Sequence, residues 1–347
     1  MKRLLCAVLP LLLLLVGCQK GPTRYSRTTV DTFDTVVQLI AYDVDEQSFA
    51  QKADSLEAAW QEYDRLYDIY NEYEGLNNLC TVNRQAGIAP VKVDARILDL
   101  LAFGKEVYTL SGGKVNIAAG AVLKLWHDAR TAGLASPATA VLPDSAALKE
   151  AAKHTDIEDM ILDREAGTVY LKDAAMSLDV GAIAKGYATE QICRQAETLW
   201  ESAAVSAGGN VRTIGVRGDG SPWQIAVENP DQTAEQPTVA TVQLKGESLV
   251  TSGDYQRYYT VGGVPYHHII DPVTLAPAAY VHETSVRCDD SGLADALSTA
   301  LFLMPVEDGK KLVDSLDGVE ALWVTMDHQI TMTDGFESRL VGNGETR

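Results

Sequence analysis

The sequence predicts an α+β fold in which helices pack on largely antiparallel sheets. Residues 28–42 alternate and are rich in β-branched side chains, which is typical of a strand, although Phe33-Asp34-Thr35 interrupts the run. Residues 50–67 instead carry apolar side chains at helical spacing. Later in the chain, residues 203–206, 211–216, 223–228 and 238–244 indicate strands, and we expect them to pair in an antiparallel sheet.

Capping and turn residues predict several further elements. Asp94 is placed as the N-cap of a helix that ends at Leu110, before Ser111-Gly112-Gly113. Residues 127–141 are rich in Ala, Thr, Gly and Pro, so we expect a loop or insertion there. Other predicted elements are a helix over 143–153, a hairpin of 160–162 with 168–171, a polar loop over 251–255, a helix over 293–303, a helix ending at 313–316 and a hairpin of 322–326 with 330–332.

Composition and charge exclude some classes of function. The chain has 347 residues, enough for a large core, and its net charge of −19 argues against binding along a nucleic acid backbone. An acidic protein that binds a phosphorylated ligand needs local positive charge or a metal. Cys80, Cys193 and Cys288 lack the spacing of metal ligands, so we expect them to be packing residues.

The N-terminus is typical of an exported protein. Lys2 and Arg3 precede an apolar run over residues 4–16, which is short for a transmembrane helix but suits a secretory leader. A small residue before Cys18 resembles a bacterial lipobox, so residues 1–17 are predicted to be removed and Cys18 to carry lipid. Residues 18–27 would then be a tether, and the protein would lie on a membrane facing the periplasm or the cell exterior. A plain signal peptide is the alternative.

The segment 178–188 is the strongest candidate for a ligand site. It is predicted to end a strand, turn at Gly181 and enter a helix that runs to about Leu199. The amide groups and dipole at a helix N-terminus favour phosphate. Asp179 and Lys185 add a carboxylate and an ammonium to this corner. The alternative is an ordinary connection between a strand and a helix.

A second candidate is the start of the helix near residue 293. Asp295 and Thr299 are four residues apart, so their carboxylate and hydroxyl share one helix face. Magnesium takes a few oxygen ligands from protein and the rest from water and phosphate, and this pair suits that pattern. The alternative is that Asp295 caps the helix and Thr299 packs nearby.

Histidines and glycines mark further candidate positions. His267 and His268 are adjacent in a predicted strand, so we expect them to point to opposite faces, one into a site and the other to the surface. Gly208, Gly209 and the Ser252-Gly253 pair end or link strands, where glycine lets the backbone approach a ligand or simply makes a turn.

These motifs, in this order, resemble the ApbE family of FAD:protein FMN transferases. The matching stretches cover nearly all of the chain after the leader, and residues 28–343 are expected to form one ApbE-like domain of T-fold-like architecture. The matching residues are 179–188, 206–210, 251–255, 268–272 with Thr274, and 294–299.

The resemblance implies roles for individual residues. The carbonyl of Ala182 and the side chains of Asp295 and Thr299 would hold Mg²⁺, and His268 would lie near the reacting phosphate. Asp179, Lys185 and Tyr70 would contact FAD. Further contacts are implied for Phe33, Ala119, Gly120, Gly208, Gly209, Ser252 and Ile270. Two positions depart from the family pattern: Phe33 stands where Met is usual, and Asn210 follows Gly208-Gly209 where Asp is usual.

The implied reaction is transfer of FMN from FAD to a Thr or Ser hydroxyl of an acceptor flavoprotein, with release of AMP. The acceptor would be a subunit of a membrane electron-transfer complex, and either Asp295 or His268 could take the hydroxyl proton. Three alternatives stay open. They are Mg²⁺-dependent hydrolysis of FAD to FMN and AMP, a flavin-binding lipoprotein without turnover and, more remotely, a structural lipoprotein of the envelope.

Overall fold

The computed structural model describes residues 21–33 and 35–342, so the predicted leader and Cys18 lie outside the described residues. The first element is β1 (Thr23–Thr32), which begins inside the segment 18–27 that the sequence predicts as a tether. In this described part of the chain, no helix is both long and apolar enough to cross a bilayer.

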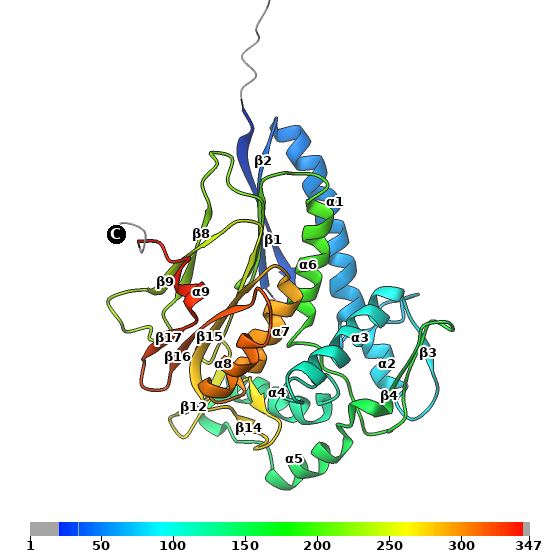
Figure 1. Cartoon of the computed structure of the whole chain (residues 1–347). Coiled ribbons are helices and arrows are strands. Elements are labelled where there is room, and N and C mark those ends of the chain that lie inside the picture. The colour runs from blue at the N-terminus through cyan, green and yellow to red at the C-terminus, as the bar shows by residue number, and fades with distance from the viewer. Residues whose placement is uncertain (1–20, 34, 343–347) are drawn as a thin grey trace, which may run out of the picture.

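One large sheet runs through the molecule (Figure 1). Its eight strands have the order β1-β2-β6-β7-β10-β15-β16-β17, and neighbouring strands are antiparallel throughout. The sheet therefore joins the first strands of the chain to the last ones, and the α+β class is confirmed. The strands after β1 are β2 (Thr35–Asp43), β6 (Ala203–Ala207), β7 (Asn210–Ile214), β10 (Ser248–Gly253), β15 (Val281–Cys288), β16 (Glu320–Thr325) and β17 (Ile330–Met332).

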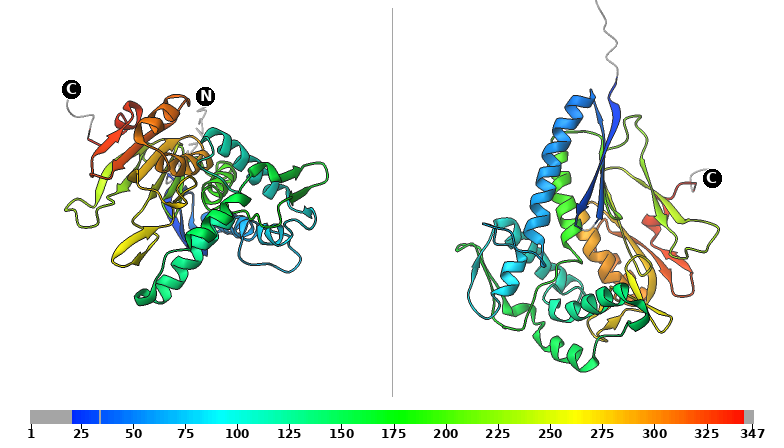
Figure 2. Two further views of the ribbon diagram at one scale, coloured as in Figure 1. Left: turned by 90° about the horizontal axis from the view of Figure 1, so that it is seen from below. Right: turned by 180° about the vertical axis from the view of Figure 1, so that it is seen from behind.

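Helices cover one face of this sheet, and a hairpin covers the other. Val205 packs with side chains of α1 (Glu46–Tyr67) and α6 (Ala184–Ala196), which lie side by side (Figures 1 and 2). Its neighbour Ala204 points to the opposite face and packs with β8 (Trp223–Glu228) and β9 (Thr238–Leu244). This alternation buries both faces of the strand, which explains the short, continuously apolar run of β6.

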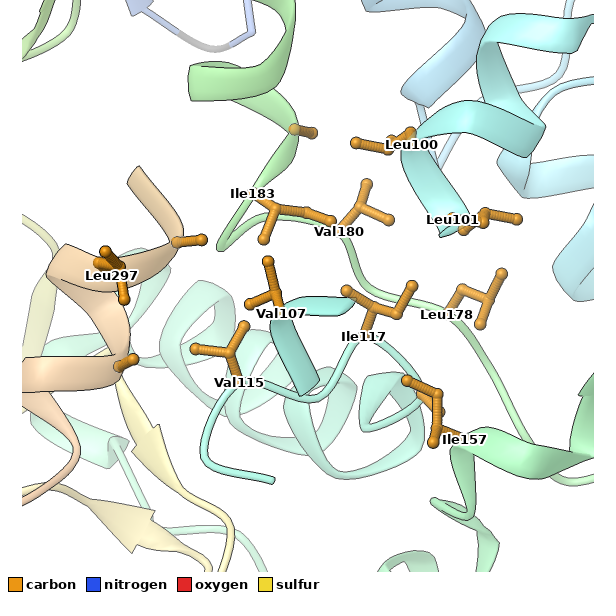
Figure 3. Packing of buried hydrophobic residues seen from close by; sticks show 14 of the residues in the cluster. Leu100, Leu101, Val107, Val115, Ile117, Ile157, Leu178, Val180, Ile183 and Leu297 are labelled. Atoms are coloured by element: carbon orange, nitrogen blue, oxygen red, sulfur yellow. The ribbon is translucent and has the colours of Figure 1, made fainter. Parts of the chain in front are cut away.

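A second core lies beside the sheet, around the segment that leads into α6. Figure 3 shows Val180 and Ile183 of this segment between Leu100 of α3 (Ala95–Leu110) and Leu297 of α7 (Ser291–Phe302). The backbone that enters α6 is thus held by apolar contacts on both sides. The second core also includes side chains of α2 (Leu79–Arg84), α8 (Val306–Asp314) and a small sheet of β3 (Val91–Lys92), β5 (Thr168–Leu171) and β4 (Met160–Asp163). The helix α5 (Ser145–Ala151) instead contributes Leu148 to a separate cluster.

Most predicted elements are confirmed. The carboxylate of Asp94 accepts a hydrogen bond from the Arg96 amide and caps α3, as expected for an N-cap. The predicted hairpins are the β4–β5 and β16–β17 pairs. Cys80, Cys193 and Cys288 are free and buried, as expected for packing residues. Further short elements are a two-stranded antiparallel sheet of β13 (Ile270–Asp271) and β14 (Ala276–Pro277) and the helix α9 (Asp334–Glu337) after β17.

Three predictions about strands are wrong in detail. Residues 28–42 fall in two strands, β1 and β2, that pair antiparallel and adjoin at Phe33 rather than forming one strand. Thr251 to Gly253 belong to β10 and are not a loop, since they pair with β15. Residues 178–180, directly before Gly181, form no strand, and the nearest pairing is a single bridge between Ala119 and Ser177.

The predicted loop over residues 127–141 is also wrong. Most of it belongs to α4 (Gly120–Ala135). Alanine favours helix, and the buried residues Val122, Trp126 and Gly133 lie on one face of α4. Gly133 is needed there because an added Cβ would lie 2.6 Å from the ring of Tyr259. The helix is therefore fixed by packing against β11 (Tyr258–Val261) and β12 (Val264–His267).

Candidate functional site

A cavity of about 330 Å³ is lined both by the large sheet and by the helices beside it. Its lining comes from α4, the turn before α6, the end of β10, the segment after β12 and α7. Of the residues singled out from the sequence, it brings together Tyr70, Ala119, Asp179, Ala182, Lys185, Gly208, Ser252, His268, Ile270, Asp295 and Thr299.

The turn before α6 is shaped by hydrogen bonds to its backbone. The amide of Asp179 donates to the carbonyl of Ile117 at 2.8 Å, and its own carboxylate accepts from the Gly181 amide at 2.9 Å. Burial raises the pKa of the Asp179 carboxyl, while the Gly181 hydrogen bond, His127 and Arg130 oppose this rise. Asp179 thus forms the turn and also faces the cavity.

The N-terminus of α6 meets α7 at a close crossing, which we call the helix corner (Ala182, Lys185, Gly186, Asp295 and Thr299). The Asp295 carboxylate is 6% exposed and accepts a hydrogen bond from the Gly186 amide at 2.7 Å. A Cβ at residue 186 would lie 2.2 Å from the Asp295 Cβ, so only glycine permits this approach. Asp295 therefore satisfies a free amide in the first turn of α6 rather than one in its own helix.

Lys185 lies beside this carboxylate. Its ammonium donates to Asn210 Oδ1 at 2.6 Å and to the Gly208 carbonyl at 3.4 Å. Burial lowers the pKa of Lys185, and the Asp295 carboxylate opposes the shift. Burial likewise raises the pKa of Asp295, and Lys185 opposes that shift. The two charges therefore stabilise each other in a corner that is poorly solvated.

Oxygen atoms dominate the other side of the helix corner. Ser252 Oγ lies 2.8 Å from Ser298 Oγ and 3.5 Å from Thr299 Oγ1. Ala182 and Asp295 line the same cavity as Ser252 and Thr299, and oxygen donors of the kind these residues carry are those that Mg²⁺ prefers. No cluster of three or more His, Cys, Asp or Glu side chains suited to a metal occurs among residues 21–33 and 35–342, and these residues carry only one carboxylate.

Both histidines line the cavity, so the expectation that one of them lies on the outer surface is wrong. His267 Nε2 lies 2.9 Å from the Ala278 carbonyl, and its Nδ1 accepts from the Ile269 amide at 3.2 Å, so its ring is held by the backbone. β12 ends at His267, and strand alternation therefore does not govern His268. Enclosure by the cavity, and then Arg257 and Arg130, lower the pKa of His268 well below its ordinary value.

Rings form another part of the cavity lining, which we call the aromatic wall (Tyr70, Trp126, His127, Tyr259 and Tyr266). The rings of Tyr70 and His127 stack with centroids 4.9 Å apart, and those of Trp126 and Tyr266 stack at 6.3 Å. Trp126 Nε1 donates to the Leu275 carbonyl at 3.0 Å, which fixes its ring. Such rings can hold a planar heterocycle by stacking.

Three predicted contact residues do not line the cavity. Phe33 packs edge-on against Trp60 and Tyr67 under the first hairpin. Gly120 begins α4 and donates to the Ser177 carbonyl, where a Cβ would lie 2.5 Å from the same oxygen. Gly209 adopts φ of 94° in the turn between β6 and β7, a backbone role that glycine fills without strain.

Sequence reasoning missed several lining residues. His127 and Arg130 were assigned to a loop, and Lys114 and Arg257 were passed over beside predicted loops. A signal for the first pair was present, since residues three apart on a helix share a face and the buried Trp126 is adjacent. Arg257 had no such signal, because its place depends on how the segment after β10 folds.

Comparison with known proteins agrees with this arrangement. The model of the ApbE family matches residues 33–323. The FAD:protein FMN transferase of Treponema pallidum (strain Nichols) is 37% identical over 280 residues, which cover 76% of this chain and 74% of the relative. That of Klebsiella pneumoniae (strain 342) is 30% identical, over 78% of this chain and 84% of the relative.

Solved structures share the fold. The ApbE protein of Thermotoga maritima superposes with a TM-score of 0.79 at 28% identity, covering 91% of this chain and 99% of that one. The flavin transferase ApbE of Vibrio cholerae gives a TM-score of 0.77 at 22% identity, over 92% of this chain and 100% of that one, a likeness of fold.

Proposed function

This chain belongs to the ApbE family, and from that premise we propose that it transfers the FMN part of FAD to a Thr or Ser hydroxyl of an acceptor flavoprotein, releasing AMP. The observation that carries the proposal is the helix corner. There a lysine, a buried carboxylate and hydroxyl oxygens face one cavity beside a helix N-terminus. This combination suits a phosphorylated ligand and its counter-charge.

Mg²⁺ is the proposed metal, held by the carbonyl of Ala182, the carboxylate of Asp295 and the hydroxyl of Thr299. These donors fit it because all are oxygen and one is charged. When bound, the ion neutralises phosphate charge. The hydrogen bond from the Gly186 amide to one oxygen of Asp295 orients the carboxylate, so its other oxygen is available to a ligand.

The reaction is a substitution at phosphorus. The acceptor hydroxyl oxygen forms a bond to the FMN-side phosphorus, the bond from that phosphorus to the bridging oxygen breaks, and AMP leaves with the electron pair. The hydroxyl proton passes to a base. Asp295 and His268 are the two candidates for this base, because both face the cavity. The aromatic wall would hold the isoalloxazine or adenine ring by stacking.

We further propose that the protein is lipid-anchored through Cys18 in the cell envelope. The leader pattern of residues 1–17 supports this, and acceptors in membrane electron-transfer complexes would be met on the same surface. Labelling with a fatty-acid probe tests it: label that is lost in Cys18→Ala supports the anchor, and unlabelled wild-type protein contradicts it.

The test of function is mass spectrometry of a candidate acceptor domain after incubation with the protein, FAD and Mg²⁺. We expect an adduct of the mass of FMN on the acceptor with wild type and none with Asp295→Ala. Asp295→Asn is the matched variant, since it keeps an oxygen for the Gly186 amide but removes the charge. AMP release without an adduct would favour hydrolysis of FAD, and FAD retained unchanged would favour a binding protein without turnover.

A further inference from the structure

We propose that Arg257 is the residue that selects a dinucleotide, by binding the diphosphate of FAD at the cavity. The proposal rests on the proposed function, because it names how the same cavity recognises its substrate. Arg257 lines the cavity next to β11, and its side chain is exposed. No residue motif marked it in the sequence, and its role follows from its surroundings in the fold.

The first observation is that the guanidinium of Arg257 lacks a counter-charge. Most arginines of the described chain pair with carboxylates, as expected for a protein with a net charge of −19. Among residues 21–33 and 35–342, no carboxylate lies within 4.0 Å of the Arg257 guanidinium. An exposed cation inside an acidic protein, without a carboxylate of its own, attracts an anionic ligand.

The second observation is that the two lysines of the cavity have acceptors within the protein. The Lys185 ammonium donates to Asn210 and to the Gly208 carbonyl. Lys114 Nζ lies 3.8 Å from a carboxylate oxygen of the buried Asp271. Arg257 is thus better able than either lysine to give its hydrogen bonds to a ligand. Its planar fork matches two phosphate oxygens, which the ammonium of a lysine does not.

The third observation is the position of Arg257 relative to the proposed chemistry. Besides burial, Arg257 is the leading charge that lowers the pKa of His268, and it also acts on Lys185. Its guanidinium is therefore within electrostatic reach of both the candidate base and the helix corner. A phosphate bound by Arg257 would therefore share the cavity with these groups.

The fourth observation is that the segment carrying Arg257 is tied to β15. The Asp254 amide donates to the His282 carbonyl at 3.1 Å, and the His282 ring lies 2.7 Å from the Asp254 carboxylate. Tyr255 donates to the buried Glu283 at 3.0 Å, and its ring covers Gly253, where a Cβ would lie 2.3 Å away. These contacts hold the backbone next to Arg257 before a ligand arrives, which reduces the entropy cost of binding.

The experiment compares ligands with and without phosphate. Quenching of flavin fluorescence in Mg²⁺ buffer without acceptor gives the Kd of FAD and of riboflavin, and chromatography verifies that FAD stays intact. In Arg257→Met we expect the Kd of FAD to rise about tenfold to a hundredfold. The Kd of riboflavin should stay within about twofold, since riboflavin offers nothing for a guanidinium fork to bind. Arg257→Lys should recover only part of the FAD affinity.

Two more variants separate binding from folding. Arg24→Met is the matched control, because Arg24 is exposed on β1 and does not line the cavity; it should bind both flavins as wild type does. Tyr255→Phe removes the tie to Glu283 but keeps Arg257, so we expect a rise of about threefold in the Kd of FAD alone.

The outcomes are distinct. An unchanged Kd of FAD in Arg257→Met overturns the inference while the proposed function stands. An equal loss of FAD and riboflavin also overturns it, because the effect would then be structural. Wild-type protein that binds neither flavin would refute the proposed function and the inference together.

Discussion

The helix corner and the aromatic wall line the same cavity but are built in different ways. In the helix corner, Asp295 is 6% exposed, and its carboxylate is bonded to a backbone amide of another helix. In the aromatic wall, Tyr70 is 54% exposed and touches His127 by stacking. One side is thus closely packed with fixed polar groups, and the other offers partly open rings.

This difference separates two tasks. Groups that act on a reacting phosphate must be held in place, and the close crossing of α6 and α7 at Gly186 does this. Rings that grip a planar ligand tolerate more movement, because stacking depends weakly on small displacements. We therefore expect changes in the helix corner to alter turnover, and changes in the aromatic wall to alter ligand affinity.

The largest effect is expected from Gly186→Ala. The new Cβ would meet the Asp295 Cβ at 2.2 Å and the Ser291 carbonyl at 2.5 Å, so the helices must separate. We expect adduct formation to slow about a hundredfold and the free energy of unfolding to fall by about 1–3 kcal/mol. Initial rates by mass spectrometry and thermal melting measure the two effects.

Gly133→Ala is the counterpart on the aromatic wall. The three atoms nearest its Cβ would be side-chain atoms of Tyr259 and Ala140, whereas those nearest a Cβ at residue 186 include a backbone carbonyl, so we expect a smaller disturbance. We expect a higher KM for FAD and a kcat within about threefold of wild type. Equal losses of kcat in both variants would remove the proposed division between the two sides.

A second effect concerns pH and the support of Arg257. Burial raises the pKa of Glu283 to about 8, and Glu228 and Asp254 act in the same direction while Tyr255 opposes it. The folded protein therefore keeps a proton on Glu283 that the unfolded chain releases above its ordinary pKa of 4.5. The contribution of this raised pKa of Glu283 to the free energy of unfolding is complete below pH 4.5 and is lost as pH rises toward 8.

Glu283→Gln should flatten this dependence. Melting temperatures of the variant should fall less than those of wild type between pH 5 and pH 8, because glutamine carries no titrating proton but still accepts from Tyr255. Glu165→Gln makes the same chemical change at an exposed position and should follow wild type. Parallel curves for wild type and Glu283→Gln would contradict the raised pKa.

The smallest effect is expected from Tyr70→Ala. Loss of one stacking ring is worth about 0.5–1.5 kcal/mol, so the Kd of FAD should rise about twofold to tenfold with kcat unchanged. Tyr70→Phe keeps the ring and removes the hydroxyl, which lies 3.2 Å from His127 Nδ1, so it should resemble wild type. A fall in kcat in Tyr70→Ala would place Tyr70 with the reacting groups instead.

Much of the helix corner could be predicted from sequence because its signals are local. Asp295 and Thr299 are four residues apart on one helix, and Asp179 and Lys185 flank one turn. Both pairs do line the cavity. Local spacing could not show that the Asp295 carboxylate binds the Gly186 amide, since the two residues are 109 positions apart.

The aromatic wall was predicted least well, for a physical reason. Residues 127–141 have weak periodicity and contain a glycine, and only packing of Trp126 and Gly133 on the β11–β12 hairpin makes α4 the stable choice. His127 and Arg130 reach the cavity as a consequence. Phe33 was placed near the ligand by resemblance, whereas its turn directs it to Trp60.

The amino-acid order alone therefore determined most helices and strands, the acidic character and the two polar pairs, because these depend on neighbours within a few residues. Only the tertiary structure decided which pairs meet, where α4 lies and that Arg257 lines the cavity. Those outcomes depend on contacts between distant segments, and no local pattern of the chain specifies them.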